Sequence, residues 1–423
     1  MVSSSRPIVA LLLFFLLLTT TSQAENWPQW RGERLDGVSH EKDLPTTWSS
    51  TEGIAWRTAL PGPGGSTPCV WGNQIYLTSA EGDAVVLLAL DTDGKILWKH
   101  QFSATGNKAV RGDEGNSASS SPCTDGKHVW AMVSGGEIGC FTPAGKPVWQ
   151  FNLQERYGKF QIAFGMTSTP VLDSGKLFLQ LIHSGGAHVL ALDAATGDEV
   201  WHHKRPSDAR AECEHSYASP VIYRDKEHEY LLTHGADYVI AHALNSGDEL
   251  WRCGGLNPPG NYNPTLRLVA SPLAVPGLIV VPSAKNGPVL GLSPSAKGNI
   301  TGTRDAHQWV REHNTPDVPS PLVVDGLLYL CREDGTLICM DAKDGTEFYT
   351  KRTHADRHRA SPVYGDGKIY LTARDGTVSV IKPGKEFEKL AENSVGETTS
   401  ASPAISNGRI YLRTFDALYA IGK

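Results

Sequence analysis

A motif of a small residue followed by proline recurs eight times along the chain and constrains its fold more than any other feature. Each copy leads into turn residues and a short β-rich run, as in STPVLDSGKLFL at residues 168–179. The prolines are Pro68, Pro122, Pro170, Pro220, Pro272, Pro321, Pro362 and Pro403, spaced 54, 48, 50, 52, 49, 41 and 41 residues apart. A period of roughly 40 to 50 residues built from short strands is typical of a β-propeller with four strands per blade.

Helical repeats with a similar period are the alternative, but the apolar runs here do not suit them. The runs are only about four to eight residues long, are rich in Val, Ile, Leu and Tyr, and end at DG, NG, SG and GG turns. No segment has the 3.6-residue periodicity of a long amphipathic helix. The sequence therefore predicts an all-β fold, an eight-bladed β-propeller of four-stranded antiparallel blades.

A second pattern marks the fourth strand of the blades. Glycine is followed four residues later by tryptophan at Gly94/Trp98, Gly145/Trp149, Gly197/Trp201 and Gly247/Trp251, and Tyr349 takes the same place after Gly345. Glycine permits the positive φ of a hairpin turn. An indole can fill the wedge between two blades while its N–H reaches a carbonyl. We expect a structural rather than a ligand-binding role for Trp56, Trp98, Trp149, Trp201 and Trp251.

The two ends of the repeat complement each other. About twenty residues follow Pro403, enough for two or three strands, whereas residues 54–60 form an outer strand that has no blade of its own. We expect this N-terminal strand to complete the last blade and close the ring, which removes open sheet edges. The predicted organisation is a signal peptide at residues 1–24, an N-terminal extension at 25–53 and a β-propeller domain at 54–423.

The first 24 residues have the pattern of a secretory signal peptide: Arg6, an apolar run from Ile8 to Leu18, and small residues at Ser22 and Ala24. An uncleaved anchor is the alternative, but these eleven residues are fewer than the ~20 that span a bilayer. We expect cleavage after Ala24, a periplasmic or secreted protein, and no transmembrane segment in the mature chain. No cysteine directly follows the apolar run, which argues against a lipid anchor.

Net charge narrows the classes of partner, and the cysteine pattern indicates how the cysteines are used. Without residues 1–24 the chain keeps 38 basic and 45 acidic side chains, a formal charge of −7 that excludes nucleic acid and anionic lipid as main partners. Its cysteines are Cys69, Cys123, Cys140, Cys213, Cys253, Cys331 and Cys339, with no CxxC or CxxCH pattern. We expect most of them to be small buried hydrophobes, although an oxidising compartment permits disulfides whose pairing the sequence leaves open.

These motifs resemble the PQQ-repeat family of eight-bladed propellers. In ALDAATGDEVW at 191–201, Ala191, Asp193, the Thr196-Gly197 turn and Trp201 match the family's blade signature. The likeness covers about residues 54–421, with shorter copies at 89–98 and 243–251 and decayed ones, SAKGNITGTRDAHQW and KPGKEFEKL, in blades five and seven. The leader NWPQWRGERLDGVS is similar to the opening of many secreted members.

The resemblance implies one of two classes of protein. In quinoprotein dehydrogenases, PQQ lies on the channel axis beneath a disulfide between adjacent cysteines, beside a catalytic Asp and a Ca²⁺ held by carboxylate and amide groups. Other members are non-enzymatic propellers that bind proteins, including the lipoprotein that assists outer-membrane protein assembly. Here no two cysteines are adjacent, no acidic cluster has Ca²⁺-loop spacing, and the chain is shorter than the dehydrogenases.

We therefore expect neither PQQ, Ca²⁺ nor another metal, and no catalytic residue can be transferred by position. The favoured function is a non-catalytic binding or scaffold module whose axial face takes a protein partner or a small molecule, with cell-envelope assembly as one setting. The alternative is a degenerate PQQ-dependent dehydrogenase, or another small-molecule enzyme that uses the channel mouth.

The segments before each Ser-Pro or Thr-Pro should cross one face of the propeller and line the mouth of its channel. Polar side chains on them form the candidate site: Arg111, Asp113, His215, Tyr217, Asn263, Arg267, His313, His358 and Arg359. Arg267, His358 and Arg359 could hold an anionic group, with His215 and Tyr217 as hydrogen-bonding partners. The alternative is that these segments are ordinary solvated loops.

Overall fold

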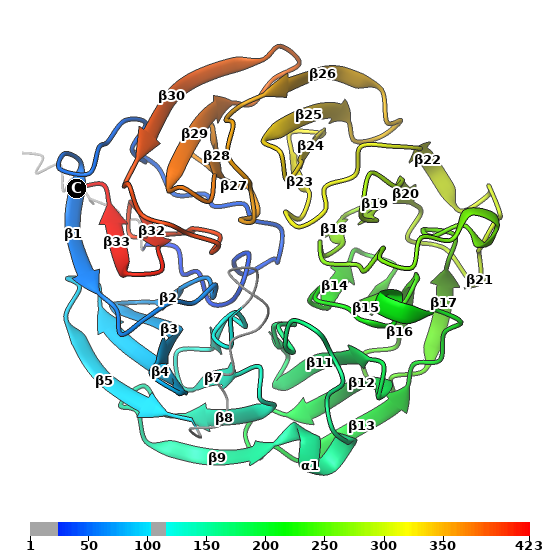
Figure 1. The fold of residues 1–423 in the computed structure, drawn as a ribbon, viewed down its shortest axis with the longest axis horizontal. Coiled ribbons are helices and arrows are strands. Elements are labelled where there is room, and N and C mark those ends of the chain that lie inside the picture. Colours follow the sequence, from blue (N-terminus) through cyan, green and yellow to red (C-terminus); the bar gives the residue numbers. More distant parts are fainter. Residues whose placement is uncertain (1–23, 103–115) are drawn as a thin grey trace, which may run out of the picture.

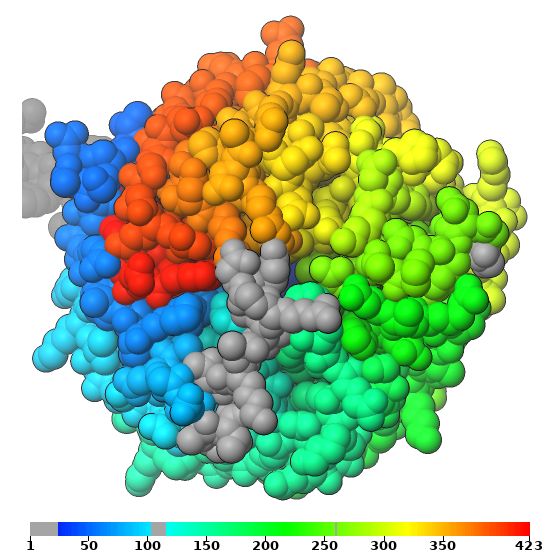
Figure 2. Space-filling model, in the orientation of Figure 1, coloured from blue at the N-terminus to red at the C-terminus, as the bar shows by residue number. Residues whose placement is uncertain are grey.

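Eight β-sheets surround a central axis in the computed structural model, which describes residues 24–102 and 116–423 (Figure 1). Successive sheets follow one another around the ring in chain order, and the space-filling view shows them as sectors of a disc coloured from blue to red (Figure 2). The predicted all-β, eight-bladed β-propeller is confirmed. Residues 1–23, which hold the apolar run of the predicted signal peptide, lie outside the described part of the chain.

The first four blades are formed by consecutive strands. Blade 1 contains β2 (Cys69–Trp71), β3 (Gln74–Glu81), β4 (Ala84–Asp91) and β5 (Ile96–Gln101), and blade 2 contains β6 (Cys123–Thr124), β7 (Val129–Met132), β8 (Glu137–Phe141) and β9 (Pro147–Asn152). Blade 3 contains β10 (Val171–Asp173), β11 (Lys176–His183), β12 (Gly186–Asp193) and β13 (Glu199–Lys204), and blade 4 contains β14 (Val221–Arg224), β15 (Glu229–Gly235), β16 (Tyr238–His242) and β17 (Glu249–Cys253).

The remaining blades depart from consecutive order in two places. Blade 5 contains β18 (Leu273–Val275), β19 (Leu278–Pro282), β20 (Val289–Leu292) and β22 (His307–Arg311), and blade 6 contains β23 (Leu322–Val324), β24 (Leu327–Cys331), β25 (Thr336–Asp341) and β26 (Glu347–Arg352). Blade 7 contains β27 (Val363–Gly365), β28 (Lys368–Thr372), β29 (Thr377–Lys382) and β30 (Glu388–Ser394), and blade 8 contains β31 (Ala404–Ser406), β32 (Arg409–Arg413), β33 (Ala417–Ile421) and β1 (Ile54–Ala59).

Short helices occur only between strands of the described residues: α1 (Leu153–Tyr157) and the 3₁₀ turns η1 (Ala211–Glu214) and η2 (Pro259–Asn261). Across residues 24–102 and 116–423, every helix is too short or too polar to span a bilayer. The inner strands are apolar because both faces of a blade pack against neighbouring blades; seven of the eight residues of β4 are buried, for example. The outer strands, such as β5, are half exposed.

The ring closes through its N-terminal strand, as the sequence predicts. Strand β1 pairs antiparallel with β33, with Thr58 opposite Leu418, and so forms the outermost strand of blade 8. An ion pair of 2.8 Å between Arg57 Nη2 and Glu397 Oε1 supports the same junction. Because β1 covers it, β33 has a neighbouring strand on each side and is not an open edge of blade 8.

Indole rings join successive blades. The N–H of Trp201 in blade 3 donates to the Leu244 carbonyl of blade 4 at 3.0 Å, and its ring lies directly against Gly247 of the same turn. Equivalent indole bonds run from Trp56 to Thr92 (2.8 Å), from Trp98 to Pro143 (2.8 Å) and from Trp149 to Ala194 (3.0 Å). Glycine is therefore needed in this turn for two reasons: the backbone has a positive φ, and a side chain would overlap the indole of the preceding blade.

Blade 5 differs from the regular pattern. An extra short strand, β21 (Gly298–Asn299), pairs parallel with β17 of blade 4, so blade 4 has five strands rather than the predicted four. The fourth strand of blade 5 carries Trp309, whose N–H donates to the Ala342 carbonyl at 2.9 Å. Trp251 is buried and faces this irregular blade, where its N–H has no hydrogen-bond partner among the described residues.

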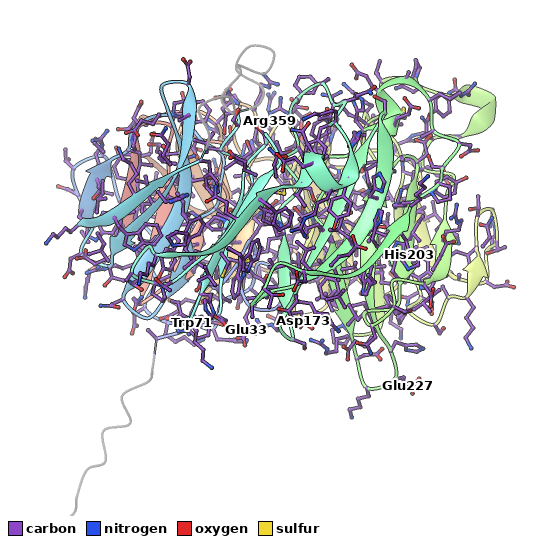
Figure 3. The ribbon with its side chains drawn as sticks, turned by 90° about the horizontal axis from the view of Figure 1, so that it is seen from below. Glu33, Trp71, Asp173, His203, Glu227 and Arg359 are labelled. Carbon is purple, nitrogen blue, oxygen red and sulfur yellow. The ribbon has the colours of Figure 1, made fainter. Side chains whose placement is uncertain are left out.

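Residues 25–48 do not project from the propeller but cross one of its faces. Backbone bonds join Trp27 to Val70 of blade 1, and Pro28 to Thr124 of blade 2. Farther along, Ser39 bonds to Tyr364 of blade 7. In the side view Glu33 lies on this face, whereas Arg359 lies on the opposite one (Figure 3). The described part of the extension therefore forms a strap across one end of the channel; we call it the N-terminal strap (residues 25–48).

All seven cysteines lie in the described residues, and all are buried with free thiols. Burial raises the pKa of the Cys140 thiol to about 12, so this thiol stays protonated at neutral pH. A protonated, buried thiol packs as a small hydrophobe, in agreement with the expectation from the sequence.

Candidate ligand site on the propeller axis

The residue before each repeated proline faces the axis. The eight side chains form a ring of hydroxyls, here called the hydroxyl ring: Thr67, Ser121, Thr169, Ser219, Ser271, Ser320, Ser361 and Ser402. The backbone N–H of each of the first seven donates to the hydroxyl of the next, at N···O distances of 2.8–3.1 Å. The motif that sets the period of the sequence therefore also links neighbouring blades around the channel.

The hydroxyl ring encloses a narrow cavity of about 140 Å³, here called the throat. Trp30 of the N-terminal strap lines the throat, and the Arg31 guanidinium lies 5.7 Å from the centre of the Trp30 ring. Arg31 donates to the Pro321 carbonyl at 2.6 Å, next to Ser320 of the hydroxyl ring. The strap thus provides the floor of the throat.

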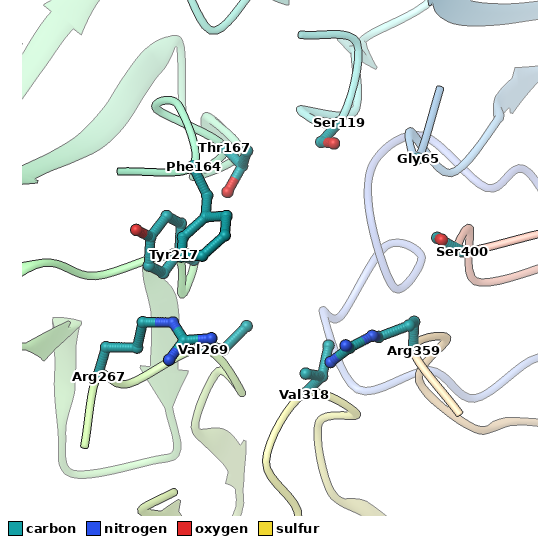
Figure 4. A pocket seen from close by; sticks show the side chains of 10 residues that line it. All are labelled: Gly65, Ser119, Phe164, Thr167, Tyr217, Arg267, Val269, Val318, Arg359 and Ser400. Atoms are coloured by element: carbon teal, nitrogen blue, oxygen red, sulfur yellow. The ribbon is translucent and has the colours of Figure 1, made fainter. Parts of the chain in front are cut away.

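A second cavity of about 170 Å³ continues the throat toward the opposite face; we call it the mouth (Figure 4). Its walls are Gly65, Ser119, Phe164, Thr167, Tyr217, Arg267, Val269, Val318, Arg359 and Ser400. Three of the predicted site residues, Tyr217, Arg267 and Arg359, meet here from different blades, as Figure 4 shows. Phe164, which sequence reasoning missed, meets Tyr217 edge to face, with ring centres 5.8 Å apart.

Both arginines of the mouth have carboxylate partners. Arg267 Nη1 lies 3.4 Å from Glu212 Oε2, and its guanidinium is 5.0 Å from the centre of the Phe164 ring. Arg359 Nη2 lies 3.3 Å from Glu333 Oε1. A ligand that binds either guanidinium must therefore share it with a glutamate, which lowers the gain from a simple ion pair.

Four of the predicted residues do not line the mouth. His358 is fully buried beside Arg359, its Nδ1 is 3.0 Å from the Asp356 carbonyl, and burial lowers its pKa. His215 lies 3.3 Å from the Ser184 hydroxyl, and burial lowers its pKa too. The Asn263 side-chain oxygen accepts hydrogen bonds from the backbone N–H and the hydroxyl of Thr265 in its own loop. His313 is exposed. Arg111 and Asp113 lie outside the described residues.

Side chains alternate between the two sides of an extended backbone, and this explains why some of the predicted residues line the mouth and others do not. Residues two positions before the hydroxyl ring, such as Arg359 before Ser361 and Tyr217 before Ser219, share its side of the chain and face the axis. Residues one position farther from the ring point the other way: His358, next to Arg359, is buried in the packing between blades 6 and 7, against Gly335 and Ala373. The prediction that His358 lines the channel with Arg359 is therefore corrected, because adjacent residues of an extended segment cannot both face the axis.

The walls do not offer the ligands that hold Ca²⁺ in the dehydrogenases that the sequence resembles. Among residues 24–102 and 116–423, the side chains that line the mouth and the throat are hydroxyls, apolar groups, aromatic rings and two arginines, with no carboxylate or amide among them. Calcium requires oxygen ligands, most of them carboxylate or amide. Nor do the described residues contain a group of three or more His, Cys, Asp or Glu that could hold a metal ion.

Comparisons with known proteins agree with this architecture. Residues 38–178 and 134–301, together more than half of the chain, match the protein family described as outer membrane protein assembly factor BamB. No curated protein sequence matches. Among solved structures, BamB from Moraxella catarrhalis has a TM-score of 0.62 and 15% identity, over 87% of this chain and 99% of that one.

Quinoprotein dehydrogenases share the fold to a similar degree. Quinohemoprotein alcohol dehydrogenase from Comamonas testosteroni has a TM-score of 0.70 and 14% identity, over 94% of this chain and 81% of that one. A europium-containing methanol dehydrogenase has a TM-score of 0.66 and 13% identity, over 90% and 87%. Identities this low establish the common propeller and no common activity. By its sequence match over residues 38–301 and by its fold, the chain belongs to the family of outer membrane protein assembly factor BamB.

Proposed function

We propose that this protein is a non-catalytic binding propeller of the cell envelope that holds a protein partner on the face around the mouth. One observation carries the proposal: the described residues that line the mouth and throat offer hydroxyls, arginines, aromatic and apolar side chains, without a carboxylate, amide or imidazole. Such walls can bind and orient a ligand. They offer no ordinary general base and no ligands for a catalytic metal.

The two faces differ in a way that favours the mouth. The N-terminal strap covers the axis on one face, where Arg31 and Trp30 are held by the blades. On the other face, aromatic and charged side chains from several blades converge, which is the concave arrangement that binding sites favour. Membership of an assembly-factor family supports a protein as partner, and the predicted signal peptide supports a periplasmic or secreted location.

Site-specific photo-crosslinking in intact cells tests this proposal. A photoreactive residue would replace Ser400 at the mouth, with Asp173 on the strap face and His203 on the outer rim as matched positions (Figures 3 and 4). We expect a discrete protein adduct from position 400 and none from the other two. Adducts only from position 173 or 203, or Ca²⁺-dependent dye reduction after reconstitution with PQQ, would contradict the proposal.

A further inference from the structure

The hydroxyls of the hydroxyl ring can donate hydrogen bonds to a group bound in the throat. All eight side chains are at most 6% exposed, and seven of the hydroxyls already accept a backbone N–H from the preceding blade. A hydroxyl that accepts in this way still has one proton to donate. No hydroxyl of the ring donates to an acceptor among the described residues, so these protons can be donated to a group that occupies the throat.

Two buried arginines add positive charge near the throat. Arg31, below the floor, donates to three backbone carbonyls, those of Leu35, Asp36 and Pro321. Its Nη1 has no partner among the described residues. The nearest carboxylate, that of Asp36, is ion-paired with Arg34 at 3.0 Å instead.

Arg413 lies behind the wall of the mouth. Its guanidinium packs against Gly64, which precedes Gly65 of the mouth. Its Nη2 donates long hydrogen bonds to the Gly62 carbonyl and the Ser79 hydroxyl, both at 3.5 Å. Nε and Nη1 have no partner in the described part of the chain. Burial lowers the pKa of Arg413 to about 9 and that of Arg31 to about 10, so both stay charged at neutral pH.

Buried cations normally require a nearby negative charge. Here two fully buried guanidiniums have no carboxylate bonded to them among the described residues. Arg31 follows Trp30 in the chain and Arg413 packs against Gly64, next to Gly65; Trp30 and Gly65 line the throat, where no described residue contributes a carboxylate. Charge and donors together favour an anionic acceptor over a neutral group. The throat, at about 140 Å³, has room for a single small group.

We propose that the throat is a carboxylate-binding site, which takes one carboxylate of a polypeptide bound across the mouth. This inference rests on the proposed function and names the chemical group that it recognises. Phe164 lines the mouth, and Tyr217, Val269 and Val318 line both the mouth and the throat, so these side chains would cover the apolar side chain next to that carboxylate. A polypeptide, rather than a free anion, is the ligand that uses both the donors of the throat and the apolar walls of the mouth.

Calorimetric titration of the mature chain tests the inference. The probes are N-acetylphenylalanine, which has a carboxylate beside an aromatic side chain, its neutral amide, and acetate. We expect the acid to bind at least about tenfold more tightly than either of the others, since the amide lacks the charge and acetate lacks the ring. Equal affinity for acid and amide would overturn the carboxylate site, and acetate as tight as the acid would overturn the polypeptide as its source.

A matched pair of variants places the binding on the axis. Thr167 lines the mouth and its side chain points into it (Figure 4). Thr167→Asp introduces a negative charge there and should weaken the acid at least about tenfold, whereas the neutral Thr167→Asn should weaken it less than about threefold. Equal effects of the two variants would overturn the site. The crosslinking result from position 400 is independent of these titrations, so failure of the throat and failure of the proposed function are distinguishable.

Discussion

Replacing Trp201 by alanine should remove one of the wedges that hold neighbouring blades together. The indole is 7% exposed, donates to Leu244 and covers Gly247. Burial of an indole removes up to about 250 Å² from water, worth about 6 kcal/mol as an upper bound at 25 cal/mol per Å². Measured truncations of large aromatic residues cost about 3–5 kcal/mol, the range that we expect here.

The assay is thermal unfolding followed by circular dichroism. An unfolding entropy of about 2.1 cal/mol/K per residue over about 400 residues gives about 0.8 kcal/mol/K, so the expected loss lowers Tm by about 4–6 °C. Val200→Ala is the matched control, because Val200 is the neighbouring residue of β13 and is 44% exposed. It should lower Tm by less than about 1 °C. A Trp201→Ala shift no larger than that of the control would refute the wedge.

Four further outcomes are expected. Gly247→Ala should lower Tm at least twice as much as Gly277→Ala, since both have positive φ but only the first added Cβ overlaps an indole. Stability measured by urea unfolding should fall from pH 7 to pH 5, because burial lowers the pKa of His234 to about 3 and of His242 to about 4. In this range these histidines take up protons in the unfolded chain but not in the folded one, which lowers the free energy of unfolding by about 2 kcal/mol per histidine at pH 5. An unchanged stability would contradict this. Deleting residues 25–60 should expose β33 as an open edge and cause aggregation or loss of the folding transition, so an unaltered melting curve would argue against closure. Addition of PQQ with Ca²⁺ should give no dye reduction over simple alcohols and sugars; Ca²⁺-dependent turnover would reverse that expectation.

The propeller could be predicted because its signals are local and repeated. Each proline and each glycine-to-tryptophan spacing marks one strand, and the leftover strand at 54–60 has only blade 8 to complete. Trp309 was harder to place, because the residues of β21 separate it from the expected turn. The strap at 25–48 has no periodicity, and its course is fixed by long-range bonds such as that of Arg31 to Pro321.

The site was predicted less completely, for a geometric reason. Sequence indicates which segments reach the axis, and so finds Tyr217, Arg267 and Arg359, but the side on which each residue points depends on the backbone. His358 shows the consequence, since it is one residue out of phase with Arg359. The signal for the hydroxyl ring is present in every copy of the motif, as the Ser or Thr before proline, but the repeat by itself marks only the start of each blade and does not show that the eight hydroxyls share one cavity.

Anomalous diffraction from crystals soaked in bromide can show whether the donor-lined throat holds an anionic group. Bromide is a small anion that accepts hydrogen bonds, and its position can be seen without a bound partner. We expect an anomalous peak on the axis, inside the hydroxyl ring between Ser121 and Ser361 and above Trp30. Bromide found only beside exposed arginines and lysines, with none in the throat, would contradict it.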